Sequence, residues 1–176
     1  MTKVAMSKRA FPARGALGPL LAAVLLLVSA AASWAGGAIT VSRSADIDKP
    51  AEEVWALIGE FAKLDTWHPA VESVTLSGDG GSGVHRLLKL DGGGEIDETL
   101  LSYSLTDKSY SYVINASPLP VANYNSTLSV TENGNGSTIL WVSTFEPVGV
   151  PDAEADKIIG GIYEAGFASV TEKLKN

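Results

Sequence analysis

The acidic residue Glu98 and the basic residue Arg86 are the side chains in this sequence best suited to fix a polar group of a bound molecule. Glu98 lies in the apolar and hydroxyl-rich segment 95–105, and a glycine-rich turn at 91–94 predicts a hairpin that brings the two residues close to opposite one another. Facing a cavity, the pair would anchor a ligand's carbonyl or carboxyl group. Facing solvent, it would be a surface ion pair that contributes a fraction of a kcal/mol. A register shift of one residue separates the two outcomes, so both stay open.

Aromatic side chains with a polar group form a second candidate set. Tyr112, Tyr124 and Trp141 fall on consecutive segments with strand character. Tyrosine and tryptophan suit a pocket wall that also orients a ligand, because each combines a large apolar ring with a hydrogen-bonding group. Ordinary core packing explains the same residues. We favour core packing for Trp141 and ligand contact for Tyr124.

The two histidines are the groups whose ordinary pKa suits proton transfer near neutral pH. Trp67 and His68 precede Pro69 in a short connection expected at the mouth of a cavity. No nucleophile or second acid accompanies them, so we predict a structural role for His68 in a surface turn and a plain surface position for His85. The chain has no cysteine and only these two histidines, which disfavours a transition-metal site. We predict no catalytic residue, metal or cofactor, and favour a protein that is not an enzyme.

The elements that position these residues follow from periodicity and turn chemistry. A strand at 38–47 is followed by a helix from Pro50 to about Phe61, and then by a short turn at 64–69. Further strands are expected at 71–77, 84–90, 95–105, 110–115, 124–132 and 138–147. Short links rich in glycine and asparagine make neighbouring strands antiparallel, because a parallel crossover needs about a dozen residues or more.

The last segment predicts a long helix that starts at a capping Asp152 and lies across the whole sheet. Its apolar stripe places Ile159, Ile162, Tyr163 and Gly166 toward the sheet, where some should line a cavity and others seal it.

Glycines inside this helix need an explanation. Gly160, Gly161 and Gly166 each cost about 1 kcal/mol relative to alanine in a helix interior. They indicate either close packing on the sheet or room for a ligand. The predicted fold class is α+β, a seven-stranded curved antiparallel sheet wrapped around a long C-terminal helix, with two short helices after the first strand. A helix cannot fill a concave sheet completely, so we expect a pocket between them.

The N-terminal segment differs from the rest. Residues 1–35 carry four basic residues, no acid and a short apolar run, which predicts a cleavable secretory signal; an uncleaved membrane anchor is the alternative. Residues 36–176 would then form one periplasmic domain without stable membrane insertion. This domain has nine basic residues against twenty acidic ones. Such a charge disfavours nucleic acid and leaves a cationic protein partner open.

Several short motifs, in this order along the chain, are together moderately specific: Val84-His85-Arg86-Leu87, Asp97-Glu98-Thr99-Leu100-Leu101, Tyr110-Ser111-Tyr112, Leu119-Pro120-Val121, Asn123-Tyr124-Asn125-Ser126-Thr127, and Trp141 in the last strand. With the order of elements, they resemble the START/Bet v 1-like (SRPBCC) superfamily, in its polyketide cyclase/dehydrase and lipid-transport group. The resemblance covers nearly all of residues 36–176. It implies a helix-grip fold that binds a small apolar ligand.

The plant abscisic acid receptors of this superfamily have a pocket glutamate and tyrosine that match Glu98 and Tyr124, which favours a pocket position for Glu98. Their gate and latch loops correspond to 90–95 and 119–121 here. Three consecutive glycines stand in this gate, and the latch lacks the receptors' histidine and arginine. The resemblance therefore does not extend to hormone recognition or phosphatase binding.

Three hypotheses follow. The first is a periplasmic protein that binds a small, largely apolar ligand anchored by Glu98, Arg86 and Tyr124. The second is a cyclase or dehydratase that uses Glu98 or His68 for proton transfer. The third is an accessory protein that docks a cationic redox partner, since the superfamily also includes exported proteins encoded alongside methanol dehydrogenase. The predicted ligand-binding residues are Trp67, Arg86, Glu98, Tyr112, Tyr124, Ile159, Ile162, Tyr163 and Gly166.

Overall fold

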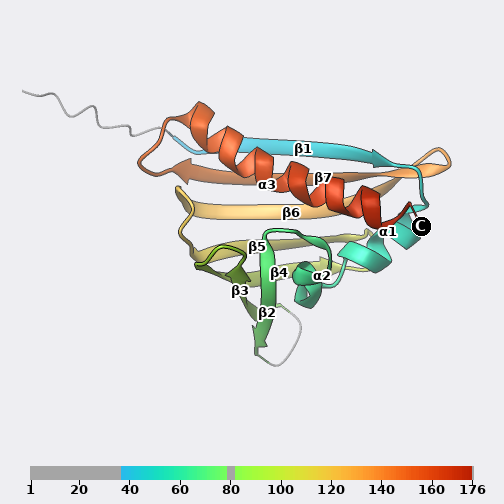
Figure 1. The fold of residues 1–176 in the computed structure, drawn as a ribbon, viewed down its shortest axis with the longest axis horizontal. Helices are drawn as coiled ribbons and strands as arrows, with labels where there is room; N and C mark the ends of the chain where they lie inside the picture. Colours follow the sequence, from blue (N-terminus) through green and yellow to red (C-terminus); the bar gives the residue numbers. More distant parts are fainter. Residues whose placement is uncertain (1–36, 79–81, 176) are drawn as a thin grey trace, which may run out of the picture. The chain divides into compact units, whose positions relative to one another are not determined.

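The computed structural model describes residues 37–78 and 82–175, which form one antiparallel sheet and the helices on its concave side. The predicted signal segment, residues 1–35, lies outside the described residues. The elements in chain order are β1 (Ile39–Ile47), α1 (Ala51–Ile58), a 3₁₀ turn (Phe61–Lys63), α2 (Leu64–Trp67), β2 (Val71–Ser77), β3 (His85–Leu90), β4 (Glu95–Ser104), β5 (Ser109–Ala116), β6 (Val121–Asn133), β7 (Gly136–Pro147) and α3 (Asp152–Lys173). Figure 1 shows α3 lying along β1 and β7.

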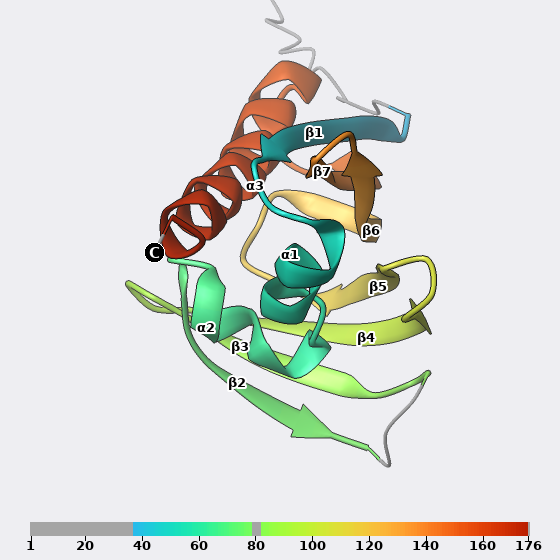
Figure 2. The same cartoon turned by 90° about the vertical axis from the view of Figure 1, so that its right-hand side faces the viewer.

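The sheet has seven strands in the order β1-β7-β6-β5-β4-β3-β2. Six of them form a meander, and β1 joins at the far edge by pairing with β7. Figure 2 shows the strands curving around the helical elements. This arrangement confirms the predicted helix-grip fold, including the two short helices after the first strand.

Two helix boundaries differ from the prediction. The first helix ends at Ile58 rather than near Phe61, because Gly59 ends the turn by donating its backbone N–H to the carbonyl of Trp55. Asp152 does not cap α3: it is already the first helical residue, Pro151 holds the capping position, and no side chain bonds there. Asp152 and Glu154 still place negative charge at the positive end of the helix.

The glycines of α3 serve close packing at two positions. A Cβ on Gly166 would lie 2.9 Å from Cδ2 of His68, and one on Gly160 would overlap the Arg43 guanidinium. Gly161 is exposed, and a Cβ there would meet nothing within 4 Å. Close packing on the sheet and α2, not room for a ligand, therefore accounts for Gly160 and Gly166.

The core lies between the concave face of the sheet and the helices. Alternate residues of β4 to β7 point into it, as the buried and exposed positions along each strand show. No helix within residues 37–78 and 82–175 is both long and apolar enough to cross a membrane. The same residues hold no cluster of three or more histidine, cysteine or acidic side chains that could bind a metal.

Candidate functional site

A cavity of about 240 Å³ lies between the concave face of the sheet and α3. Its wall is mainly aliphatic and aromatic, with a few polar groups. The lining residues are Leu64, His68, Ala70, Val71, Leu88, Leu90, Asp91, Ile96, Glu98, Tyr112, Ile114, Leu119, Tyr124, Trp141, Ile159, Ile162 and Tyr163. Such a wall suits a compact apolar ligand that is oriented by few polar contacts.

Of the nine residues predicted to bind a ligand, six line this cavity: Glu98, Tyr112, Tyr124, Ile159, Ile162 and Tyr163. Arg86, Trp67 and Gly166 do not line it. Arg86 lies behind the cavity wall, where it contacts Glu98 and the ring of Tyr112, and Trp67 packs behind the wall between Trp141 and Gly166.

Arg86 and Glu98 form a buried ion pair at one end of the cavity. The β3–β4 ladder places them directly opposite one another, with Arg86 fully buried and Glu98 4% exposed. Nε of Arg86 donates to Oε2 of Glu98 over 2.5 Å, and its Nη1 donates to the carbonyl of Phe61 over 2.7 Å. Of the two outcomes left open by the sequence, the ion pair on the solvent face is therefore wrong, because the strand register turns both side chains inward.

Aromatic rings surround the Arg86 guanidinium. Its Cζ lies 3.9 Å from the centroid of the Phe61 ring and 5.1 Å from that of Tyr112. These faces favour a cation that has lost water. The carboxylate raises the pKa of Arg86 against the effect of burial, so the guanidinium keeps its charge. Burial raises the pKa of Glu98 and Arg86 opposes that shift; because the cation cannot be neutralised, we assign the pair as ionised.

One oxygen of Glu98 remains open. Oε2 accepts the bond from Arg86, while Oε1 accepts no hydrogen bond from any described residue. Because Glu98 lines the cavity, Oε1 is a hydrogen-bond acceptor offered to whatever occupies it.

Tyrosine hydroxyls form a second polar cluster, beneath α3. The hydroxyls of Tyr124 on β6 and Tyr163 on α3 bond to each other over 2.5 Å. Nε1 of Trp141 donates to the hydroxyl of Tyr112 over 3.1 Å, and the Trp141 ring stacks on Tyr163 with centroids 4.4 Å apart. Burial raises the pKa of Tyr112, Tyr124 and Tyr163, so all three stay neutral phenols. Trp141 packs in the core, as predicted, and it also forms part of the cavity wall.

His68 joins α2 to α3 rather than standing in a surface turn. It is only 3% exposed, which corrects the predicted surface position. Its Nδ1 accepts the backbone N–H of Ala70, so Nε2 carries the proton and donates to the carbonyl of Ile162 over 3.0 Å. Burial lowers the pKa of His68, and the nearby Arg86 charge adds to that effect. Both ring nitrogens are used, which disfavours proton transfer by this imidazole.

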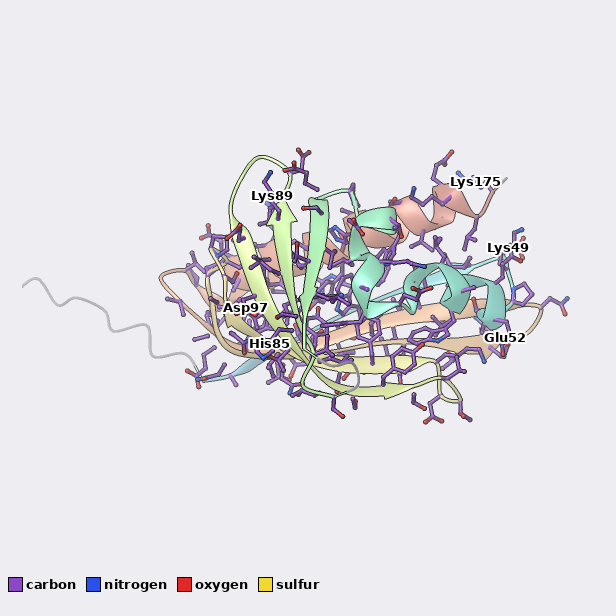
Figure 3. The ribbon with its side chains drawn as sticks, turned by 90° about the horizontal axis from the view of Figure 1, so that it is seen from below. Lys49, Glu52, His85, Lys89, Asp97 and Lys175 are labelled. Atoms are coloured by element: carbon purple, nitrogen blue, oxygen red, sulfur yellow. The ribbon has the colours of Figure 1, made fainter. Side chains whose placement is uncertain are left out.

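His85 lies on the outer face of the sheet, beside Asp97 of the next strand (Figure 3). Its Nδ1 is 3.2 Å from Oγ1 of Thr99 and 3.4 Å from Oδ1 of Asp97. This exposed cluster is separate from the cavity and agrees with the surface position predicted for His85.

Residue-level prediction missed much of the apolar wall, including Leu88, Leu90, Ile96 and Ile114. The alternation of β3 and β4 could have found Leu88 and Ile96, since both share the inward face with Arg86 and Glu98. Asp91 and Leu119 come from loops, for which no periodic signal exists.

Comparison with known proteins assigns the fold to a family. The family described as polyketide cyclase / dehydrase and lipid transport matches residues 38–175. The chain belongs to this family. None of the curated proteins compared with it matches.

Solved structures of other proteins share this fold. An uncharacterized protein from Bacillus thuringiensis is 34% identical, with a TM-score of 0.74 over 78% of this chain and 100% of its own. The protein XoxI from Bacillus cereus is also 34% identical, with a TM-score of 0.72 over 76% of this chain and 94% of its own. Ara h 8.0201, at 18% identity and a TM-score of 0.66 over 80% of this chain and 100% of its own, shares the fold.

Proposed function

We propose that this protein is an exported binding protein that holds a small, largely apolar ligand in the cavity between the sheet and α3. The observation that carries the proposal is a hollow of about 240 Å³ whose wall is mainly apolar and aromatic and includes the buried Glu98, whose Oε1 accepts no hydrogen bond from any described residue. Family membership supports ligand binding in this place.

The polar groups narrow the chemistry of the ligand. An ionised Glu98 accepts hydrogen bonds only, so it suits a hydroxyl or another donor on the ligand. Tyr112, which lies beside the Arg86–Glu98 pair, accepts from Trp141 and can still donate its own proton to a ligand oxygen. The volume lies slightly below the range of roughly 300–1,000 Å³ usual for ligand pockets, so a compact molecule fits best.

The enzyme hypothesis has less support. His68 and Glu98 both line the cavity, but hydrogen bonds occupy both nitrogens of His68, and Arg86 holds Glu98. A general acid needs a proton to give and a general base needs a free lone pair of sufficient basicity. The charge of Arg86 lowers the basicity of Glu98, although its Oε1 is free. His68 has neither a free proton nor a free lone pair, and no described residue places a second acid or base beside Glu98 to complete a proton transfer.

The accessory hypothesis is a second candidate, and two observations favour it. Residues 36–176 carry nine basic against twenty acidic residues, a charge that attracts cationic partners. The likeness to XoxI at 34% identity fits a role beside a redox enzyme such as a methanol dehydrogenase system.

Native mass spectrometry of protein purified from its own cells tests the binding role. We expect a co-purifying small molecule whose occupancy falls about tenfold in Glu98→Gln, which removes the charge of the acceptor, or in Tyr124→Phe, which removes a hydroxyl from the cavity wall; each effect is about one hydrogen bond's contribution. Glu95→Gln on the same strand and the exposed Tyr103→Phe are matched controls, since neither residue lines the cavity. Absence of any bound mass, together with no thermal shift from lipids, quinones or aromatic acids, would end the proposal.

Export has its own test. Cell fractionation followed by N-terminal sequencing should find the protein in the periplasm, with a chain that begins at Gly36. A full-length chain retained in the membrane would instead support an uncleaved anchor.

A further inference from the structure

The charges around the cavity between the sheet and α3 are unevenly distributed. Two carboxylates, Asp91 and Glu98, belong to its wall, whereas none of the described residues that line it is a lysine or an arginine. His68, the histidine of the wall, is neutral, because its Nδ1 accepts a backbone N–H and its Nε2 donates to a carbonyl. With Arg86 behind the wall, the set has two formal negative charges against one positive. A cationic ligand would balance the excess, and an anionic ligand would increase it.

The carboxylate of Glu98 is the group that can hold such a cation. It is 4% exposed, its Oε2 accepts from Nε of Arg86, and its Oε1 accepts no hydrogen bond from any described residue. A carboxylate can accept from several donors, and a bond between two ionised groups is about twice as strong as one between neutral groups. A hydroxyl would satisfy Oε1. An ammonium group would satisfy it and also oppose the excess negative charge.

The guanidinium of Arg86 leaves this arrangement open. It donates to Oε2 of Glu98 and to the carbonyl of Phe61, and its Cζ lies 3.9 Å from the centroid of the Phe61 ring. Arg86 is fully buried and does not line the cavity. A molecule in the cavity therefore contacts the carboxylate rather than the guanidinium.

The rest of the wall favours a cation with an apolar body. Aromatic rings line it from three strands and α3, and the face of such a ring attracts cations and repels anions. These rings belong to Tyr112, Tyr124, Trp141 and Tyr163.

Asp91 is exposed, and it adds a negative charge where the wall meets solvent. We propose that the ligand is a compact primary amine, bound as its ammonium ion, which donates to Oε1 of Glu98 while its apolar body packs against the aromatic wall. This inference rests on the proposed function and adds the chemical class of the ligand.

Three probes of similar shape test the preference for a cation. Phenylethylamine, 2-phenylethanol and phenylacetate each have a phenyl ring and a two-carbon chain, and at neutral pH they are a cation, a neutral molecule and an anion. Titration calorimetry of the purified protein at low ionic strength should give the amine the highest affinity and the acid the lowest. In about 0.3 M NaCl the amine should bind more weakly and the alcohol should bind as before, because salt screens charges.

Variants assign the preference to Glu98. Glu98→Gln alone leaves Arg86 without its counter-charge, so the test variant combines it with Arg86→Leu, which removes both charges of the pair. We expect this double variant to bind phenylethylamine about tenfold or more weakly, because a bond to a charged group is lost, and 2-phenylethanol within about threefold of the wild type. Asp91→Asn should weaken amine binding about threefold. Glu95→Gln is its matched control, since it removes an exposed charge outside the wall and should leave the affinity unchanged.

Two results would overturn the inference alone. One is tighter binding of 2-phenylethanol or phenylacetate than of phenylethylamine by the wild type, because the protein then still binds an apolar molecule but without a preference for a cation. The other is equal affinity for the amine in the wild type and the double variant, because Glu98 then plays no part. If none of the three probes binds, the proposed function fails together with the inference.

Discussion

Two glycines of α3 both lack space for a side chain, but what fills that space differs. Gly166 faces Trp67 and His68, rings that are 1% and 3% exposed. Gly160 faces Arg43, whose half-exposed guanidinium bonds Oδ2 of Asp156 over 2.7 Å and Oε1 of Glu164 over 2.9 Å. Buried rings cannot move without disturbing their neighbours, whereas a surface guanidinium can. We call the half of α3 around Gly166, which is fixed by packing, the packed end, and the half around Gly160, which is held by adjustable charges, the adjustable end.

The largest effect should come from the packed end. In Gly166→Ala, the new Cβ lies 2.9 Å from His68 and 3.1 Å from Trp67. Overpacking costs typically about 1–3 kcal/mol, and the better helix propensity of alanine returns at most about 1. We expect a loss of about 1–2 kcal/mol in unfolding free energy, measured by urea denaturation at pH 7.5. Stability equal to the wild type would mean that the rings yield, and the contrast between the two glycines would disappear.

The packed end should also respond to acid. Burial lowers the pKa of His68 below its ordinary value of 6.5, so the neutral ring is favoured in the fold. Its contribution is fully present above that value and is lost as pH falls through the lower, folded pKa. We expect unfolding free energy to drop between pH 7.5 and 5.5.

His68→Gln should flatten that profile, because glutamine does not titrate and its amide can still donate to the Ile162 carbonyl. His85→Gln is the matched control, since it replaces the other histidine at an exposed site. If His85→Gln flattens the profile and His68→Gln does not, the buried ring is not the source of the acid sensitivity.

Gly161 is the reference position for Gly160 and Gly166, because a side chain there changes helix propensity without a packing contact. It is exposed, and a Cβ there would contact nothing within 4 Å. Gly161→Ala should therefore stabilise the protein by about 1 kcal/mol through helix propensity alone. If Gly161→Ala unfolds at a lower urea concentration than the wild type, this prediction is wrong, and the exposed face of the helix has an unrecognised role.

The glycines also show how far sequence reasoning reaches. The unfavourable helix propensity of the glycines is visible from sequence, and it predicted that either close packing or a ligand offsets this cost. The partners of these glycines are not visible from sequence, because Arg43 on β1 and Trp67 on α2 are distant from α3 along the chain and only the tertiary fold brings them together. Strand and helix order, by contrast, follow from local periodicity and turns, and the helix-grip fold could be predicted from them together with the family resemblance.

The candidate site divides in the same way. The predicted hairpin correctly placed Arg86 near Glu98. Which face of the sheet the two side chains occupy depends on the strand register, which is fixed by a turn where the backbone N–H of Leu90 donates to the carbonyl of Gly94. The gap beside residues 113–117 and 121–125, where the pairing of β5 with β6 stops, was not predicted at all. Alternation continues along β6 through Tyr124 while the pairing with β5 has already stopped, and no local pattern reports a missing partner.

The smallest effect is expected at the adjustable end, and salt should reveal its origin. Gly160→Ala gains about 1 kcal/mol of helix propensity but displaces Arg43 from two surface ion pairs, each contributing roughly 0.2–1 kcal/mol. The two terms nearly cancel, so unfolding free energy should change by less than about 0.5 kcal/mol at low ionic strength. In about 0.5 M NaCl the ion pairs are screened, and the variant should become more stable than the wild type. Arg43→Ala removes the same pairs, so in that background Gly160→Ala should stabilise as much as Gly161→Ala does at any salt concentration. A Gly160→Ala variant that stays destabilised in the Arg43→Ala background would show that backbone or sheet atoms, not the guanidinium, occupy the space beside this glycine.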